Sequence, residues 1–226
     1  MNRDLAIQKI EKDFELISNL VLEQLQLLDE LFTTDQKKRR EELVRILGKN
    51  EAKIDQSEIH LDENIIRTIV LYQPMAGDLR RLFAIYHMTI NLERVSDLVV
   101  AVTGTYMELK DSVLREESAS ALHQMLKTTS HMVSNALLSY VNSDQEMATK
   151  TIQKESAFDE LNKKVLKRSI KAAGLPKKSQ SILNNLVDMR TMISSIERIG
   201  DHATNIAESS IYAISGSNVR HGSKNE

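Results

Sequence analysis

Apolar residues recur at intervals of three or four positions along almost the whole of this 226-residue sequence. Side chains at these intervals return to the same face of an α-helix, so each such stretch predicts an amphipathic helix. The sequence contains only seven glycines and two prolines, too few for the many tight turns of a β-sandwich or β-barrel. The pattern therefore predicts an all-α fold.

The residues that interrupt this pattern divide it into six long helices. We expect these helices over about 7–32, 35–72, 75–109, 119–140, 145–173 and 177–214. Asp35 and Asp144 are expected to cap the second and fifth helices, because an Asp side chain can accept hydrogen bonds from free N–H groups of the first turn. Pro74 is expected to end the second helix, since its ring clashes with the preceding turn.

Two acidic motifs each occur twice, and the copies are separated by the same 104 residues. Glu51 and Asp55 recur as Glu155 and Asp159, and Glu93 and Asp97 recur as Glu197 and Asp201. A shared offset indicates tandem duplication of a three-helix unit. We therefore expect two three-helix bundles, over residues 1–110 and 115–214. Residues 215–226 are polar and have little to bury, so a disordered tail is expected there.

The acids of each motif are spaced i, i+4 and so share one helix face. Asp55 and Glu93 lie 19 residues before and after Pro74, so on antiparallel helices they come level at about 1.5 Å per residue. Four carboxylates that meet in one bundle repel one another unless a cation neutralises them. Oxygen ligands of this kind suit Mg²⁺, Mn²⁺ or iron. The predicted metal ligands are Glu51, Asp55, Glu93, Asp97, Glu155, Asp159, Glu197 and Asp201.

The alternative interpretation is that these acids lie on a solvated face and pair with Arg94, Arg198 and nearby lysines. His202, which directly follows Asp201, is the one histidine that the sequence suggests as an auxiliary ligand. No Glu-x-x-His motif of the ferritin-like di-iron proteins is present. The formal net charge of −2 gives no basic field for nucleic acid, and the absence of cysteine excludes thiolate metal sites. No apolar run reaches the length of a membrane span, so membrane contact is expected to be peripheral.

Two longer stretches bring the sequence close to a known family. The segments NLERVSD (91–97) and IERIGDHATNIAE (196–208), with QP (73–74) and DLR (78–80) before the first, resemble the motifs of the PhoU family. The resemblance extends over essentially the whole chain. It implies two three-helix bundles, with one metal cluster for each set of four acids and with His202 and Asn205 near the second.

The resemblance also implies a function. Proteins of this kind are non-enzymatic regulators that restrain phosphate uptake and the phosphate-starvation response. We accordingly expect a cytoplasmic adaptor, peripheral at the inner face of the membrane, between the ATPase subunit of a phosphate ABC transporter and a sensor histidine kinase. A homodimer or higher homo-oligomer is expected. The two repeats differ where Ala101 corresponds to Asn205 and Glu58 to Asn162, so their sites are expected to differ.

Two other functions are compatible with the same residues. One is a carboxylate-bridged metal enzyme, a hydrolase or oxidase, in a helix bundle. The other is an accessory protein of a metal-phosphate permease, which shares the helical build.

Overall fold

The computed structural model describes residues 2–109, 112–154 and 180–220. Its long helices are α1 (Arg3–Thr33), α2 (Lys37–Tyr72), α3 (Ala76–Glu108), α4 (Ser112–Val141) and α6 (Gln180–Ser215). Residues 145–154 are also helical, and the described part of the chain contains no strand. The predicted all-α fold is confirmed.

The ends of the first helices follow local backbone chemistry. The side chain of Asn2 caps α1 by accepting a hydrogen bond from the backbone N–H of Leu5, 2.9 Å away. As predicted, α2 ends at Tyr72 just before Pro74, and Gln73 closes it in the left-handed conformation, with φ of 43°.

The predicted cap at Asp35 is wrong. Helix α2 begins one residue later than that cap requires, with Gln36 at the N-cap position and no side-chain cap bond. The Asp35 carboxylate is fully exposed and lies 3.7 Å from Nη2 of Arg40. The hydroxyl of Thr34 instead accepts a hydrogen bond from the backbone N–H of Gln36, at 3.4 Å. Helix α2 therefore starts without a side-chain cap on the free N–H groups of its first turn.

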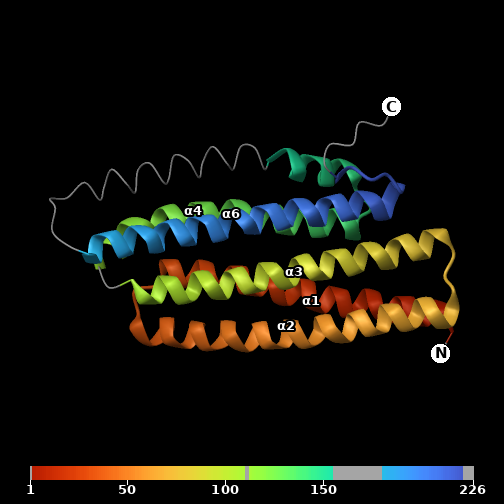
Figure 1. Cartoon of the computed structure of the whole chain (residues 1–226), viewed down its shortest axis with the longest axis horizontal. Coiled ribbons are helices and arrows are strands. Elements are labelled where there is room, and N and C mark those ends of the chain that lie inside the picture. The colour runs from red at the N-terminus through yellow and green to blue at the C-terminus, as the bar shows by residue number, and fades with distance from the viewer. Residues whose placement is uncertain (1, 110–111, 155–179, 221–226) are drawn as a thin grey trace.

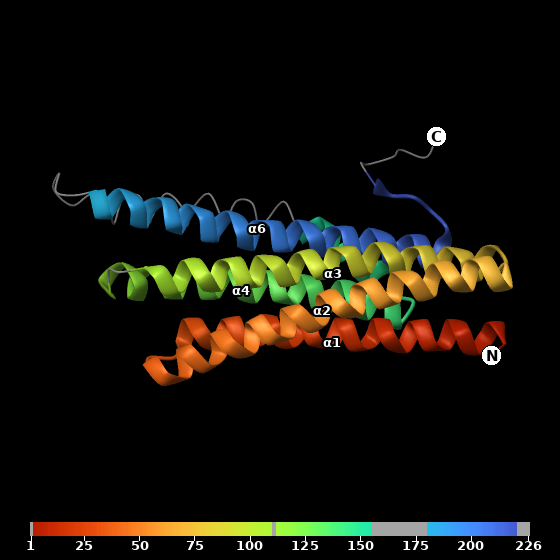
Figure 2. The same cartoon turned by 60° about the horizontal axis from the view of Figure 1, so that its bottom comes forward.

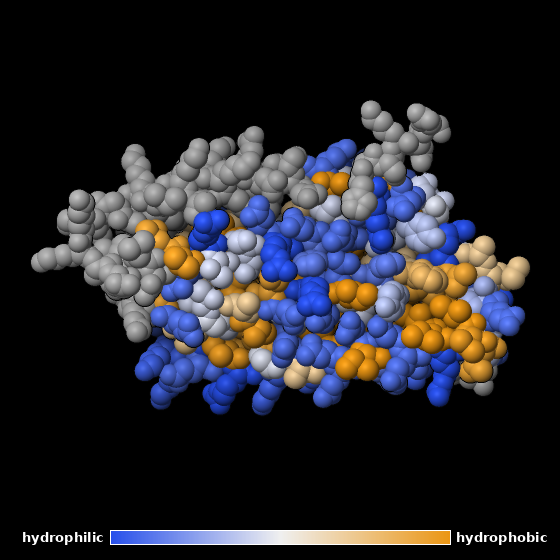
Figure 3. All heavy atoms as spheres, viewed as in Figure 1, coloured by the Kyte–Doolittle hydropathy of each residue, from blue (hydrophilic) through white to orange (hydrophobic). Residues whose placement is uncertain are grey.

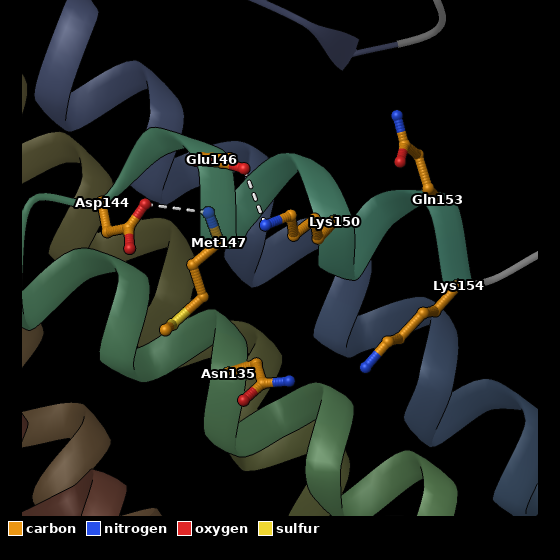
Figure 4. A pocket seen from close by; sticks show the side chains of 7 residues that line it. All are labelled: Asn135, Asp144, Glu146, Met147, Lys150, Gln153 and Lys154. Carbon is orange, nitrogen blue, oxygen red and sulfur yellow. Dashed lines mark hydrogen bonds and ion pairs between the residues drawn. The ribbon is translucent and has the colours of Figure 1, made fainter.

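The cap predicted at Asp144 is confirmed (Figure 4). Oδ1 of Asp144 accepts a hydrogen bond from the backbone N–H of Met147 at 2.9 Å, at the start of the helical residues 145–154. Ser143 before it has φ of 52°, the left-handed conformation that reverses the chain after α4. Lys150 pairs with Glu146 one turn earlier, at 2.7 Å.

The helices share one continuous core. Helices α1, α2 and α3 pack on one another, α3 also packs on α6, and α1 packs on α4 (Figure 1). Inside the first three helices Phe32 meets Tyr106 edge to face, with ring centroids 4.9 Å apart. Phe14 of α1 meets Tyr140 of α4 in the same way, at 5.6 Å. Apolar burial therefore joins the two halves of the chain as well as the helices within each.

Helices α3 and α6 run antiparallel, so the end of α6 lies beside the start of α3 (Figures 1 and 2). Residues 216–220 then turn back along the bundle, and Val219 packs against the core. This short segment belongs to the range for which a disordered tail was expected, whereas residues 221–226 lie outside the described part. Val219 buries part of its apolar surface there, and the backbone N–H of Gly216 donates to the carbonyl of Tyr212 at 2.9 Å.

Exposed apolar side chains gather at the end of the molecule where α2 turns into α3 (Figure 3). Val70, Leu71 and Met75 each leave more than 60% of their surface in solvent there. No helix in the described ranges is both long and apolar enough to cross a bilayer.

Candidate metal centre

Three of the predicted ligands meet between α2 and α3. Glu51 and Asp55 are one turn apart on α2, and Asp97 faces them from α3. One carboxylate oxygen of each lies within 4.8 Å of the others, and all three side chains are half-buried. Glu51 and Asp97 are each 23 residues from Pro74, so the antiparallel geometry of the two helices brings them level.

Glu93 lies one turn from Asp97 but outside this group of three. Its Oε2 pairs with Nε of Arg94 at 3.3 Å, and Arg94 also reaches Oδ2 of Asp97 at 3.5 Å. Burial, followed by the charge of Asp97, raises the pKa of Glu93 to about 7, although Arg94 opposes the shift. The carboxylates of Glu58 and Asp55 add to the rise. Glu93 is therefore electrostatically part of the same acidic cluster.

Two further acids, which the sequence analysis did not include among the ligands, extend the cluster along α2. Glu58 and Asp62 continue the face of Glu51 and Asp55 at steps of three and four residues. Burial and then the charge of Asp55 raise the pKa of Glu58. Burial and then Glu58 raise the pKa of Asp62 to about 6. The helical stripe was visible in the sequence, but Glu58 has no acidic counterpart in the second repeat.

The donor atoms of this cluster fit a hard cation. Oδ1 of Asp55 and Oδ1 of Asp62 are both buried, and neither has a hydrogen-bond partner. A buried carboxylate oxygen without a partner is costly, and a metal ion can supply the missing interaction. Arg94 is the one cation that pairs with these acids among the described residues. The cluster is accordingly suited to hold Mg²⁺, Mn²⁺ or iron through oxygen ligands alone.

The second set of predicted ligands is described only in part. Glu197 is half-buried and Asp201 exposed on α6, whereas Glu155 and Asp159 lie outside the described residues. The meeting of four acids in the second bundle therefore stays a prediction.

His202 and Asn205 of α6 contact the first repeat. Nδ1 of His202 lies 2.9 Å from Oδ1 of Asn91 on α3, and the amide of Asn205 donates to the same oxygen at 3.1 Å. The amide Nδ2 of Asn91 donates to the backbone carbonyl of His87 at 2.7 Å, so Oδ1 is left to accept. The proton of the neutral His202 ring is therefore on Nδ1, and only Nε2 is left to ligate a metal.

The surroundings of His202 keep it neutral. Burial first, and then the charges of Arg198 and Arg94, lower the pKa of His202 to about 4. The contact of an α6 histidine with α3 had no signal in the sequence, because it depends on how the two halves pack.

The sequence model of the PhoU domain family matches residues 14–103 and 122–210, which are most of both halves of the chain. The chain belongs to the PhoU family. A Burkholderia protein named as a homologue of the phosphate-specific transport system accessory protein PhoU is 31% identical over 175 residues, 76% of this chain and 73% of that protein. A similarly named protein of Methanothermobacter thermautotrophicus is 26% identical and aligns over 92% of each chain.

Solved PhoU structures share the fold. The phosphate transport system regulatory protein PhoU from Streptococcus pneumoniae superposes with a TM-score of 0.81 at 24% identity, over 96% of this chain and 99% of that one. PhoU from Pseudomonas aeruginosa gives a TM-score of 0.76 over 95% and 99%. These relatives are named as accessory or regulatory proteins of phosphate transport, and none of the names is that of an enzyme.

Proposed function

We propose that this chain is a negative regulator of phosphate uptake and of the phosphate-starvation response. The observation that carries the proposal is a half-buried carboxylate cluster on α2 and α3 in a chain whose relatives are named as accessory proteins of phosphate-specific transport. The chain acts by stoichiometric contact and not by catalysis. Its proposed partners are the ATPase subunit of a phosphate ABC transporter and a sensor histidine kinase, at the inner face of the membrane.

Two carboxylate metal centres are part of this proposal. Glu51, Asp55, Glu93 and Asp97 hold one ion or cluster, and the corresponding acids Glu155, Asp159, Glu197 and Asp201 hold the other. Bound metal neutralises the acids and fixes the spacing of α2 and α3. The side chains of Arg94 and Glu58 adjust the charge around the first centre. A homodimer is the expected assembly in the cytoplasm.

The regulatory function is tested with a phosphate-starvation reporter in cells grown with ample phosphate. Deleting the gene should raise reporter expression, and the intact gene should restore repression. The double variant Asp55→Asn/Asp97→Asn should restore it poorly, because it removes two clustered ligands. Glu23→Gln on the exposed face of α1 is the control, with one acid removed away from the cluster.

Unchanged reporter expression in the deletion strain would contradict the proposal. That result would favour the alternative function, an accessory protein of a metal-phosphate permease, whose loss alters metal-phosphate uptake instead. Turnover of a phosphate or redox substrate that is lost in the Glu93→Gln and Glu197→Gln variants would favour a metal enzyme.

A further inference from the structure

Exposed apolar side chains are concentrated at the end of the molecule where α2 turns into α3, beside the start of α1 (Figures 1, 2 and 3). Five residues there each leave more than half of their surface in solvent, and together they form the apolar tip: Leu5, Ile66, Val70, Leu71 and Met75. Exposed apolar residues are normally scattered singly over a protein surface. A cluster of five at one end therefore indicates contact with an apolar partner.

The α1 and α2 parts of the apolar tip belong to one face of the molecule. Lys9 of α1 lines a small groove between the two helices together with Arg67 and Leu71 of α2. Leu5 is one turn before Lys9 on α1, and Leu71 is one turn after Arg67 on α2. Basic and apolar side chains therefore alternate across the line where α1 and α2 meet.

The basic side chains on this face are not held by acids. Lys9, Lys12 and Arg67 are exposed, and none of them forms an ion pair within the part of the chain that the structure describes. Glu63 is exposed one turn before Arg67 on α2, but the two side chains do not come within ion-pair distance. The positive charges beside the apolar tip are therefore free to attract an anionic surface.

We propose that the apolar tip and the neighbouring Lys9, Lys12 and Arg67 bind the surface of an anionic lipid bilayer. Apolar side chains can enter the boundary between headgroups and acyl chains, while lysine and arginine stay among the anionic headgroups. The apolar tip projects at the end of a helix pair (Figure 1). This shape suits a fluid surface, whereas a protein partner would need a matching hollow.

The inference rests on the proposed function for the location of the chain at the inner face of the membrane. It adds to that function a direct contact with lipid, which requires neither the transporter nor the kinase. The position of the surface rests only on the exposure and charge of the residues at this end of the molecule.

Lipid binding is tested by co-sedimentation of the full chain with phosphatidylcholine vesicles that contain or lack phosphatidylglycerol. We expect binding that requires the anionic lipid and weakens about tenfold or more in Val70→Ser/Met75→Ser, because two apolar side chains no longer enter the bilayer. Arg67→Gln should weaken binding about fivefold. Val187→Ser and Arg45→Gln are the matched controls, since both residues are exposed near the starts of α6 and α2, at the opposite end (Figure 1). Circular dichroism establishes that each variant is folded.

The orientation of the chain on the bilayer is tested with a fluorescent probe. The sequence contains no cysteine, so Met75→Cys can carry a single polarity-sensitive fluorophore. Its emission should shift to the blue on anionic vesicles, because the probe enters an apolar medium. The same probe in Val187→Cys should show no shift.

Failure of the chain to bind anionic vesicles would overturn the proposal, as would equal binding by the wild type and Val70→Ser/Met75→Ser. Loss of self-association in this variant, with unchanged vesicle binding, would also overturn it, because the apolar tip would then be a contact between copies of the chain. The vesicle assays use the purified chain alone, and the reporter assay uses the deletion strain. Failure of the lipid contact and failure of the regulatory function are therefore distinguishable.

Discussion

Oδ1 of Asn91 on α3 lies 2.9 Å from Nδ1 of His202 on α6. Asn91 is two residues before Glu93, and His202 directly follows Asp201. The hydrogen bond therefore joins the acidic motif of the first repeat to that of the second. The α3–α6 contact thus fixes how the two motif-bearing helices sit against each other.

Replacing Asn91 with Ala should lower the free energy of unfolding by about 1–2 kcal/mol, since the hydrogen bonds to His202 and Asn205 are lost together. Urea denaturation measures the change. Asn19→Ala is the matched control, because Asn19 is an exposed asparagine of α1. Equal midpoints for the Asn91 and Asn19 variants would contradict the role assigned to this contact.

A second helix contact depends on small side chains. The hydroxyl of Ser139 on α4 donates to that of Ser210 on α6 at 2.9 Å, and both residues are fully buried. Ser210→Leu should destabilise the fold by about 1–3 kcal/mol, because a larger side chain overpacks the contact and removes the hydrogen bond. Thermal unfolding is the measurement, with Ser194→Leu on the exposed face of α6 as control. Tolerance of leucine at position 210 would show that α4 and α6 can separate at little cost.

Adding Mn²⁺ or Mg²⁺ to metal-free protein should raise its stability, because an ion held by Glu51, Asp55 and Asp97 binds the folded chain alone. At a concentration one hundred times Kd the gain is about 2.7 kcal/mol. The melting temperature should therefore rise with metal in the wild type and less in Asp55→Asn, while Glu23→Gln should follow the wild type. A metal-independent melting curve would argue that the acids form a solvated face.

In metal-free protein the acidic cluster should make stability depend on pH. The pKa of Glu93 is raised from 4.5 to about 7 on folding, so the folded state binds the proton more tightly than the unfolded state. Its contribution to stability is fully present below pH 4.5 and is lost as the pH rises through 7. The side chain of Gln in Glu93→Gln does not titrate. Between pH 5 and 8 the free energy of unfolding of the wild type should therefore fall by about 1 kcal/mol relative to this variant, allowing for solvent screening.

Urea midpoints of the wild type and the Glu93 variant across this pH range measure the difference. The same comparison can be made with Asp62→Asn. The wild type should lose stability relative to this variant as the pH rises through about 6, since the pKa of Asp62 is raised to about 6. Parallel pH profiles for the wild type and Glu93→Gln would contradict the electrostatic account of the cluster.

The helical fold and part of the candidate centre were predictable from the sequence. The end of α2 before Pro74 follows from the chemistry of proline. The cap at Asp144 follows from a local contact, because its carboxylate accepts from the N–H of Met147, three residues further along the chain. The meeting of Glu51 with Asp97 required only one further assumption, that α2 and α3 form an antiparallel pair. Asp35 failed as a cap because α2 begins after Gln36, and the sequence alone does not determine at which of several adjacent polar residues a helix begins.

The tertiary structure decided the relations between distant segments. The sequence by itself determined the helices, the duplication and the acidic faces, because each depends on residues within a few turns of one another or on a repeated spacing. The pairing of Asn91 with His202 and the contact of Arg80 with Gly216 depend on which surfaces of the chain pack together. Such packing is set by the joint burial of apolar side chains from both halves of the chain, and no local spacing in the sequence encodes it.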